Sequence, residues 1–366
     1  MNRSRRLRLA AAAATIAALT SGLATGGASA SAAPSVSKGH RALSDARSAA
    51  VRVPDVTIPY GTPFGKLSVW RQDIRSAPLN GNSAAMVANV ADQAAKYYGG
   101  VAAFNVNRYS TSFYAVPATT ARVDVRWDNC QKKTWTPSGL LGAGGQFSQV
   151  PIPANAVPAA GTDGQLTVYS PATDQLWEFW QAKKVGGTWQ ACWGGRIDGV
   201  STSPGYFTGG FGVSASGLSY GGGTIGIKEV QAGSIDHAMA LQLPSTANWN
   251  NISWPAQRSD GNDTGKNAVP EGTRLRLDPS VDVDALRISP IAKMVAKAAQ
   301  TYGFIVTDKA GVVAVVAESP AATVAATGKN PWPALMQGKP DYQVMAGFPW
   351  DRLQALPKDY GKTAAR

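Results

Sequence analysis

The chain has 366 residues, 44% of them hydrophobic and 16% charged, with 35 basic and 23 acidic residues and a formal net charge of +12. After residue 33, glycine, proline or a charged residue interrupts every apolar run, which excludes a helix of the roughly 20 apolar residues that span a membrane. The basic residues form no run and no basic-aromatic motif, so nucleic acid is not an expected partner.

The N-terminal residues have the three parts of a secretory signal peptide. Arginines at positions 3, 5, 6 and 8 precede the apolar run Leu9 to Leu23, and the small residues Ala28-Ser29-Ala30 follow it. The sequence therefore predicts a signal peptide over residues 1–33 and a secreted, extracellular protein.

An Ala-, Ser- and Pro-rich stretch without apolar periodicity predicts a flexible lead-in over residues 34–65. Residues 66–366 are long enough for one globular domain with a substantial core. Since the signal peptide carries four of the 35 basic residues and none of the acidic ones, the remaining chain keeps a charge near +8. This charge suggests attraction to anionic polymers such as acidic polysaccharides, or it serves solubility alone.

Two helices are indicated by their capping residues. Asn82-Ser83 predicts the start of a helix over residues 84–98, and Ser289-Pro290 predicts a second one that ends at Gly303. Short strands separated by Gly, Pro, Asn and Asp clusters are predicted at 122–127, 165–169, 175–181, 224–230, 238–243, 274–277 and 303–307. This pattern, with 39 glycines, predicts a mainly β fold, a β-sandwich or jelly-roll-like domain with two or more peripheral helices.

The only cysteines, Cys130 and Cys192, are expected to form a disulfide in an oxidising compartment. Metal binding is not expected from two cysteines and two histidines, although the turn Asp260 to Asp263 offers oxygen atoms of the kind that calcium prefers. The same residues suit a turn for backbone reasons. The glycine-rich span Gly205 to Gly223 lacks a Walker lysine and a dinucleotide fingerprint, so no cofactor is expected.

Three segments carry side chains suited to glycan chemistry. In the strand Asp174 to Gln181, alternation places Glu178 on the same face as Trp180, and aromatic rings beside a carboxylate suit sugar binding. The alternative is that both faces are core and that Glu178 pairs with a basic residue such as Arg196. The segment Gly221 to Leu243 contains His237, the only histidine of the expected domain, with an ordinary pKa near neutrality.

His237 shares a face with apolar residues, so it is either a proton shuttle or a hydrogen-bonded core residue. Asp236 falls on the opposite face, beside the small residues Ala238 and Ala240. The third segment, a polar-aromatic stretch from Trp249 to Asp263, is predicted to be a loop, where binding residues concentrate.

Six stretches match a known pattern: Trp70 to Ser83, Asp174 to Trp180, Glu229 to Ala238 ending in Ile235-Asp236-His237-Ala238, Trp254-Pro255-Ala256, Gly272 to Leu277 and Tyr302 to Val306. With these, the chain resembles a family of secreted bacterial (actinobacterial-type) single-domain proteins of uncharacterised function, from about Trp70 to Met345. The resemblance implies secretion and a single domain, and it transfers no catalytic residue. Where relatives have a second histidine after the Trp-Pro-Ala turn, this chain has Gln257-Arg258, which weakens a two-histidine mechanism.

The leading hypothesis from the sequence is a secreted glycoside hydrolase that acts on a microbial or plant polysaccharide or a cell-wall glycan. The predicted catalytic residues are Glu178, Glu229, Asp236 and His237, with Asp198 as a further substitute carboxylate. The predicted substrate-binding residues are Trp180, Tyr220, Trp254 and Arg258.

Three alternatives stay open. A polysaccharide lyase would use His237, Tyr220 and Arg258 on an acidic glycan. A non-catalytic protein would bind glycan or cell wall through an aromatic platform, and a structural protein of the envelope would lack a deep polar cleft. In each case the expected protein is a monomer without a bound metal or cofactor.

Overall fold

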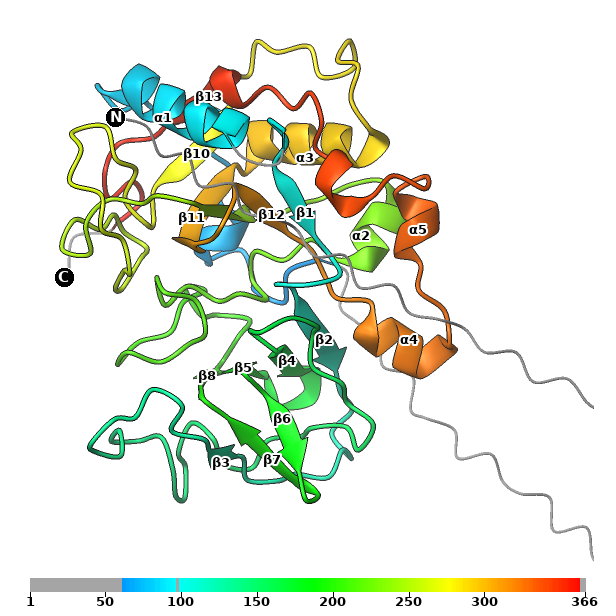
Figure 1. Ribbon diagram of the computed structural model, residues 1–366. Helices are drawn as coiled ribbons and strands as arrows, with labels where there is room; N and C mark the ends of the chain where they lie inside the picture. The colour runs from blue at the N-terminus through cyan, green and yellow to red at the C-terminus, as the bar shows by residue number, and fades with distance from the viewer. Residues whose placement is uncertain (1–60, 97–98, 363–366) are drawn as a thin grey trace, which may run out of the picture. The chain divides into compact units, whose positions relative to one another are not determined.

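Three β-sheets of mixed strand direction form the framework of the protein (Figure 1). The computed structural model describes residues 61–96 and 99–362, which belong to one compact unit, Val51–Arg366. The predicted signal peptide and most of the predicted lead-in lie outside the described residues. The mainly β fold with peripheral helices is confirmed.

The largest sheet has six strands in the order β1-β12-β9-β11-β10-β13. Their bounds are Ala103–Asn105 (β1), Ala314–Val316 (β12), Met239–Leu243 (β9), Phe304–Lys309 (β11), Arg274–Leu277 (β10) and Leu353–Ala355 (β13). β1 pairs with β12 and β9 with β11 in parallel, and the other pairs are antiparallel. The β9–β11 pair has a bulge between Val306 and Asp308, and this irregularity bears on the site described below.

Helices α1 (Ser83–Lys96) and α3 (Pro290–Thr301) confirm the two helices predicted from their caps. The Ser289 hydroxyl accepts a hydrogen bond from the Ala292 backbone N–H at 3.0 Å, as an N-cap residue does. Figure 1 shows α1 beside β13 and α3 beside β10, where their apolar faces close one hydrophobic core over the six-stranded sheet. Within residues 61–96 and 99–362, no helix combines the length and apolarity that crossing a bilayer requires.

The strand predicted at 224–230 is wrong, because the helix α2 (Ile227–Ala232) occupies most of it. Two carboxylates bind the free N–H groups at its start. Glu229 accepts from the Gly226 N–H at 2.8 Å, and Glu318, distant in sequence, accepts from the Ile227 N–H at 2.9 Å. Two further helices, α4 (Ala321–Thr327) and α5 (Trp332–Leu335), and short 3₁₀ helices at Val69–Arg71, Pro171–Thr173, Asp341–Gln343 and Trp350–Arg352 complete the helical segments of the described residues.

The two smaller sheets lie next to one another in the lower half of Figure 1. One contains β2 (Thr111–Ala115), β4 (Gln165–Ser170), β5 (Gln175–Trp180) and β8 (Trp193–Asp198), and the other β3 (Arg126–Trp127), β7 (Thr188–Ala191) and β6 (Lys183–Val185). The strands predicted at 165–169, 175–181, 238–243, 274–277 and 303–307 are confirmed with small shifts at their ends. The strand predicted at 122–127 is reduced to β3 and an isolated bridge between Val123 and Val150.

The glycine-rich span is packed around Trp70, which is fully buried. The Trp70 indole N–H donates to the Gly205 carbonyl at 2.8 Å, and a Cβ atom added to Gly222 would lie 2.3 Å from the same nitrogen. Only glycine allows the backbone this close to the ring. Phe64, near the end of the predicted lead-in, is also buried in this core, so packing within the described residues begins before Lys66.

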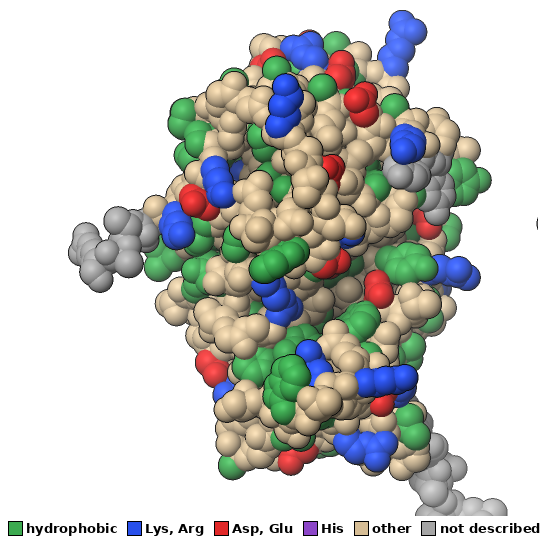
Figure 2. Space-filling view, turned by 60° about the vertical axis from the view of Figure 1, so that its left-hand side comes forward, with side chains coloured by type: hydrophobic (Ala, Val, Ile, Leu, Met, Phe, Trp, Pro, Cys, Tyr) green, Lys and Arg blue, Asp and Glu red, His purple; other side chains and the backbone are tan. Residues whose placement is uncertain are grey.

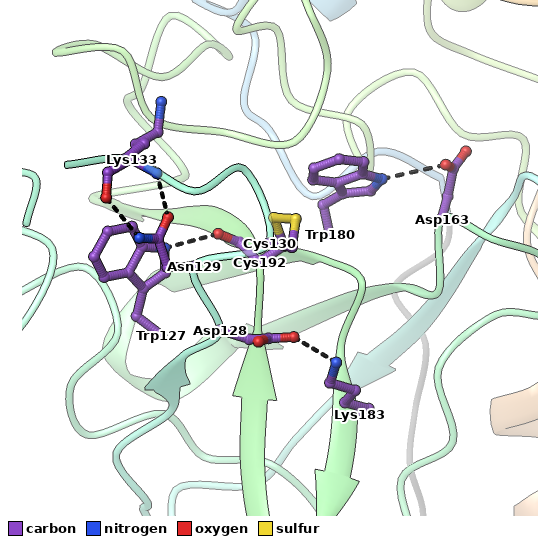
Figure 3. The surroundings of a disulfide bond; sticks show 9 residues. All are labelled: Trp127, Asp128, Asn129, Cys130, Lys133, Asp163, Trp180, Lys183 and Cys192. Carbon is purple, nitrogen blue, oxygen red and sulfur yellow. Dashed lines mark hydrogen bonds and ion pairs between the residues drawn. A yellow bond between two sulfur atoms is a disulfide. The ribbon is translucent and has the colours of Figure 1, made fainter.

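The predicted disulfide between Cys130 and Cys192 is confirmed (Figure 3). It joins the loop after β3 to the residue that precedes β8. The Trp127 indole N–H donates to the Cys192 carbonyl at 3.0 Å, so a hydrogen bond supports the same connection. The loop after β3 is thereby attached covalently to the edge of the four-stranded sheet.

Replacing both cysteines with alanine should lower the free energy of unfolding by about 4 kcal/mol, because the bond closes a loop whose ends are 62 positions apart. Urea unfolding of the oxidised wild type, the reduced wild type and the variant measures this effect. The reduced wild type should match the variant. Equal midpoints for all three would show that the bond does not constrain the unfolded chain.

Candidate functional site

A cavity of about 930 Å³ opens between the six-stranded sheet and the two smaller sheets. Its volume is near the upper end of the range for small-molecule sites, about 300–1,000 Å³. Figure 2 shows a face that is hollowed near its middle, with hydrophobic, acidic and basic side chains around the hollow. The cavity is lined by the same mixture: Trp180, Trp193, Asp163, Asp260, Asp308, Lys133, Arg258, Lys309, Asn105, Tyr109, Gln165 and Gln242 are among its residues.

One wall is a row of side chains across the six-stranded sheet. Strand register places Ala103 opposite Ala314, Ala314 opposite Gln242, and Gln242 opposite Asp308. Residues opposite each other point to the same face of a sheet. The two alanines leave space above the sheet, and Gln242 and Asp308 supply polar groups beside that space.

Asp308 is a partly buried carboxyl group held by two backbone donors. The Ala215 N–H donates to its Oδ2 at 3.2 Å and the Lys309 N–H to its Oδ1 at 3.0 Å. Burial, followed by the negative charge of Asp260 and to a smaller extent of Asp163, raises the pKa of Asp308 to about 7. A carboxyl group with this pKa can donate a proton near neutral pH.

Asp260 is exposed at the cavity and lies close to a second buried carboxyl group, Glu271. The Thr246 hydroxyl donates to Glu271 at 3.2 Å. Burial first, then the neighbouring Asp260 and Asp308, raise the pKa of Glu271 to about 9, so Glu271 is protonated at neutral pH. The cavity therefore contains a proton-donating carboxyl group, Asp308, beside a more exposed one, Asp260.

The opposite wall contains two tryptophans that face each other across neighbouring strands. Trp180 on β5 pairs with Trp193 on β8. The Trp180 indole N–H donates to Asp163 at 3.2 Å, and Trp193 stacks on Phe211 with 5.8 Å between ring centroids. Gln165, also on this wall, is buried and its Oε1 has no hydrogen-bond partner among the described residues.

Arg258, a predicted substrate-binding residue, lies at the cavity but is engaged with the backbone. Its guanidinium donates to the carbonyls of Gly210, Gly212, Ser214 and Ala215. The Ala215 N–H in turn donates to Asp308. Arg258 therefore fixes the backbone segment that donates to Asp308. Of the four predicted substrate-binding residues, Arg258 and Trp180 line the cavity.

Three of the four predicted catalytic residues are brought together, but away from the cavity. His237 and Glu229 are fully buried, with 3.1 Å between Nε2 and Oε2, and Asp236 pairs with Arg71 at 2.8 Å. Burial lowers the pKa of His237, but the Glu229 carboxylate and the Ala238 carbonyl outweigh it, so the pKa lies above its usual value. None of these residues lines the cavity. Their catalytic roles stay predictions from the sequence.

Glu178 occupies a separate place under the glycine-rich span and is fully buried. It accepts hydrogen bonds from the Ser219 hydroxyl at 2.7 Å, the Gly221 N–H at 2.8 Å and the Tyr220 N–H at 3.0 Å. Burial outweighs these bonds and raises the pKa of Glu178 to about 7. It contacts neither Arg196 nor Glu229, so the structure does not bring the sequence-predicted carboxylate pair into contact.

Replacing Glu178 with alanine should lower the free energy of unfolding by about 3 kcal/mol, because it leaves two backbone N–H groups and one hydroxyl buried without an acceptor. Glu178→Gln keeps an acceptor and should cost clearly less. Urea unfolding compares the two variants with the wild type. If the alanine variant were as stable as the wild type, Glu178 would not hold the glycine-rich span.

Of the remaining predicted residues, Tyr220 lies behind the cavity wall, whereas Trp254 and Asp198 lie outside the lining. Tyr220 is buried, and its hydroxyl donates to the Tyr109 carbonyl at 2.8 Å and accepts from the Gln242 amide at 3.3 Å. It thus supports two lining residues from behind. Trp254 packs edge-on against Tyr206 with 6.4 Å between centroids, and Asp198 is exposed beside Arg196. Neither lines the cavity.

In the part of the chain that the structure describes, no group of three or more His, Cys, Asp or Glu side chains is arranged to hold a metal ion. Comparison with protein-family models, with curated proteins and with solved structures finds no match to this chain.

Proposed function

We propose that the protein is a glycoside hydrolase that cleaves a polysaccharide in this cavity. Asp308 is the general acid, and Asp260 is the general base or nucleophile. The observation that carries the proposal is that both carboxyl groups lie in one large cavity with Trp180 and Trp193. The sequence predicted Glu178 and Glu229 as the two carboxyl groups, whereas this proposal uses Asp308 and Asp260. The proposed reaction class is the same.

The proposed reaction follows the usual chemistry of two carboxyl groups. Asp308, protonated near neutral pH, donates its proton to the glycosidic oxygen as the bond between that oxygen and the anomeric carbon breaks. Positive charge develops on the sugar ring, and either Asp260 or a water deprotonated by Asp260 attacks the anomeric carbon. Asp308 then accepts a proton from water when a covalent intermediate is hydrolysed, or is reprotonated from solvent.

The other lining residues would bind the sugar. Apolar faces of pyranose rings stack on indole rings, so Trp180 would hold a sugar unit next to the acid pair. Asp163, which lines the cavity, would accept hydrogen bonds from sugar hydroxyls. The disulfide favours an oxidising environment, and we place the activity outside the cell.

Incubation of the purified protein with neutral and acidic polysaccharides tests the proposal. New reducing ends without ultraviolet absorbance from unsaturated sugars would support hydrolysis. Matching absorbance would identify a lyase instead. Absence of both products with every polymer, combined with retention of a polymer on a native gel, would replace the hydrolase with a glycan-binding protein.

A further inference from the structure

Lys133 lies at the cavity on the wall that carries the tryptophans, and it differs from the other cations there. Arg258 donates to four backbone carbonyls, and Lys309 donates to Asn262 at 3.1 Å. For the Lys133 ammonium group, no ion pair and no hydrogen-bond acceptor is found among residues 61–96 and 99–362. All three of its N–H donors are left for a ligand or for solvent.

Two indole rings hold this ammonium group in place. The Lys133 Nζ lies 5.2 Å from the Trp193 ring centroid and 5.6 Å from that of Trp135. At these distances the ring faces attract the positive charge. Trp193 is itself fixed by stacking on Phe211 and by donating its indole N–H to the Gly210 carbonyl at 3.2 Å.

Hydrogen bonds to the Asn129 side chain hold the backbone of Lys133 (Figure 3). The Asn129 side chain accepts from the Lys133 N–H at 2.8 Å and donates to the Lys133 carbonyl at 2.7 Å. The disulfide at Cys130 ties the same loop to the residue before Trp193. A charge positioned before the ligand arrives binds it with a smaller loss of conformational entropy.

We infer that Lys133 binds the carboxylate of an acidic sugar unit, so that the polysaccharide bound in the cavity is a polyuronate. The inference rests on the proposed function, since it assigns a substrate class to the same cavity. Lys133 belongs to the wall opposite Asp308. In this arrangement a uronate unit places its carboxylate on Lys133, and a neighbouring glycosidic oxygen faces Asp308 and Asp260.

The unpaired ammonium group of Lys133 favours an anionic over a neutral substrate. Lys133 is exposed enough to reach solvent, and a charge-assisted hydrogen bond from an ammonium to a carboxylate is stronger than one to a hydroxyl. The carboxyl groups of Asp308 and Glu271, with pKa values of about 7 and 9, are wholly or partly protonated near neutral pH. They therefore repel an anion less than two carboxylates would.

Titration calorimetry with the Asp308→Asn variant, in which cleavage is expected to be at least about 10²-fold slower, tests this inference. The probes are oligomers of polygalacturonate, polyguluronate, polymannuronate and polyglucuronate, each as the carboxylate and as its methyl ester. At least one carboxylate oligomer should bind about tenfold more tightly than its ester. Equal affinity for acid and ester in every pair, or no binding by any acidic oligomer, would overturn the inference.

Substitution of Lys133 ties the effect to this side chain. Lys133→Met keeps the contact with both indoles and should weaken binding of the carboxylate oligomer about tenfold, with the ester unaffected. Lys133→Arg should retain most of the affinity. The control Lys358→Met removes an exposed ammonium group that donates to Asn251. Neither residue lines the cavity, so affinity should not change. Unchanged affinity in Lys133→Met would overturn the inference.

These results separate the inference from the proposed function. If the wild type cleaves neutral polymers and Lys133→Met has no effect, the hydrolase stands and the substrate class fails. If the wild type cleaves nothing but binds uronate oligomers through Lys133, the substrate class stands and the protein is a binding protein.

Discussion

Asp308→Asn is expected to lower kcat/KM on the polysaccharide that the protein cleaves by about 10²–10⁴, the contribution typical of a positioned general acid. Asparagine keeps one of the two acceptor oxygens, so the hydrogen bond from the Ala215 N–H can be retained while the acidic proton is lost. Asp260→Asn should reduce the rate at least as much, because it removes the base or nucleophile. Initial rates from reducing-end assays measure both effects.

A matched control and a pH profile make this prediction specific. Asp92→Asn changes an exposed carboxylate on α1, outside the cavity lining, and should leave the rate unaffected. Because Asp308 must be protonated to act, the wild-type rate should fall as pH rises above about 7, the pKa of this group. If Asp308→Asn kept most of the wild-type activity, another residue would have to supply the proton.

The protein should be markedly less stable at pH 9 than at pH 5. The buried carboxyl groups of Glu178, Glu318 and Glu271 have pKa values raised to about 7, 8 and 9, mainly by desolvation. Between their unfolded pKa, near 4.5, and these values, the folded state binds more protons than the unfolded chain. The free energy of unfolding therefore falls as pH rises through that window.

Each such group contributes about 1.4 kcal/mol per pH unit while it is protonated in the fold and ionised in the unfolded chain. A total loss of at least about 4 kcal/mol between pH 5 and pH 9 is expected. His237 acts in the same direction, since its raised pKa stabilises the fold only while the imidazole is protonated.

Urea unfolding across this pH range, at constant ionic strength, measures the slope. Glu318→Gln mimics the protonated carboxyl group and keeps an acceptor for the Ile227 N–H, so it should flatten the slope between pH 5 and 8. Stability that rises with pH would mean that these carboxyl groups are ionised in the folded protein.

Local signals in the sequence were sufficient for elements whose ends are capped by neighbouring residues. The helix α3 follows from Ser289-Pro290 and Gly303, all of which act within one turn of it. The helix α2 could not be found this way. One of the two carboxylates that bind its first N–H groups, Glu318, lies far along the chain, and only the folded protein brings it to Ile227.

The candidate acid was missed for a related reason. In an unbroken strand, alternation would place Asp308 on the face of Phe304 and Val306, which are buried in the core. The bulge at Thr307 moves Asp308 to the opposite face, next to Gln242 and the cavity. A lone acidic residue at the end of an apolar strand was the only available signal, and it does not reveal a bulge.

Trp180 and Arg258 were identified because aromatic and basic residues in strand and loop segments suggest glycan binding by their chemistry alone. The sequence did not group these two residues with Asp163, Asp260 and Lys133, because those three come from three separate loops. Their convergence depends on strand order, which the sequence does not display.

The pairing of β1 with β12 also bears on how the cavity is made. Ala103 and Ala314 lie opposite each other, although β1 is the first strand of the described residues and β12 is the last but one. Contacts between residues so distant in sequence form late and slowly, because a long loop must close first. Because both strands line the cavity, the cavity is complete only after β12 has paired with β1.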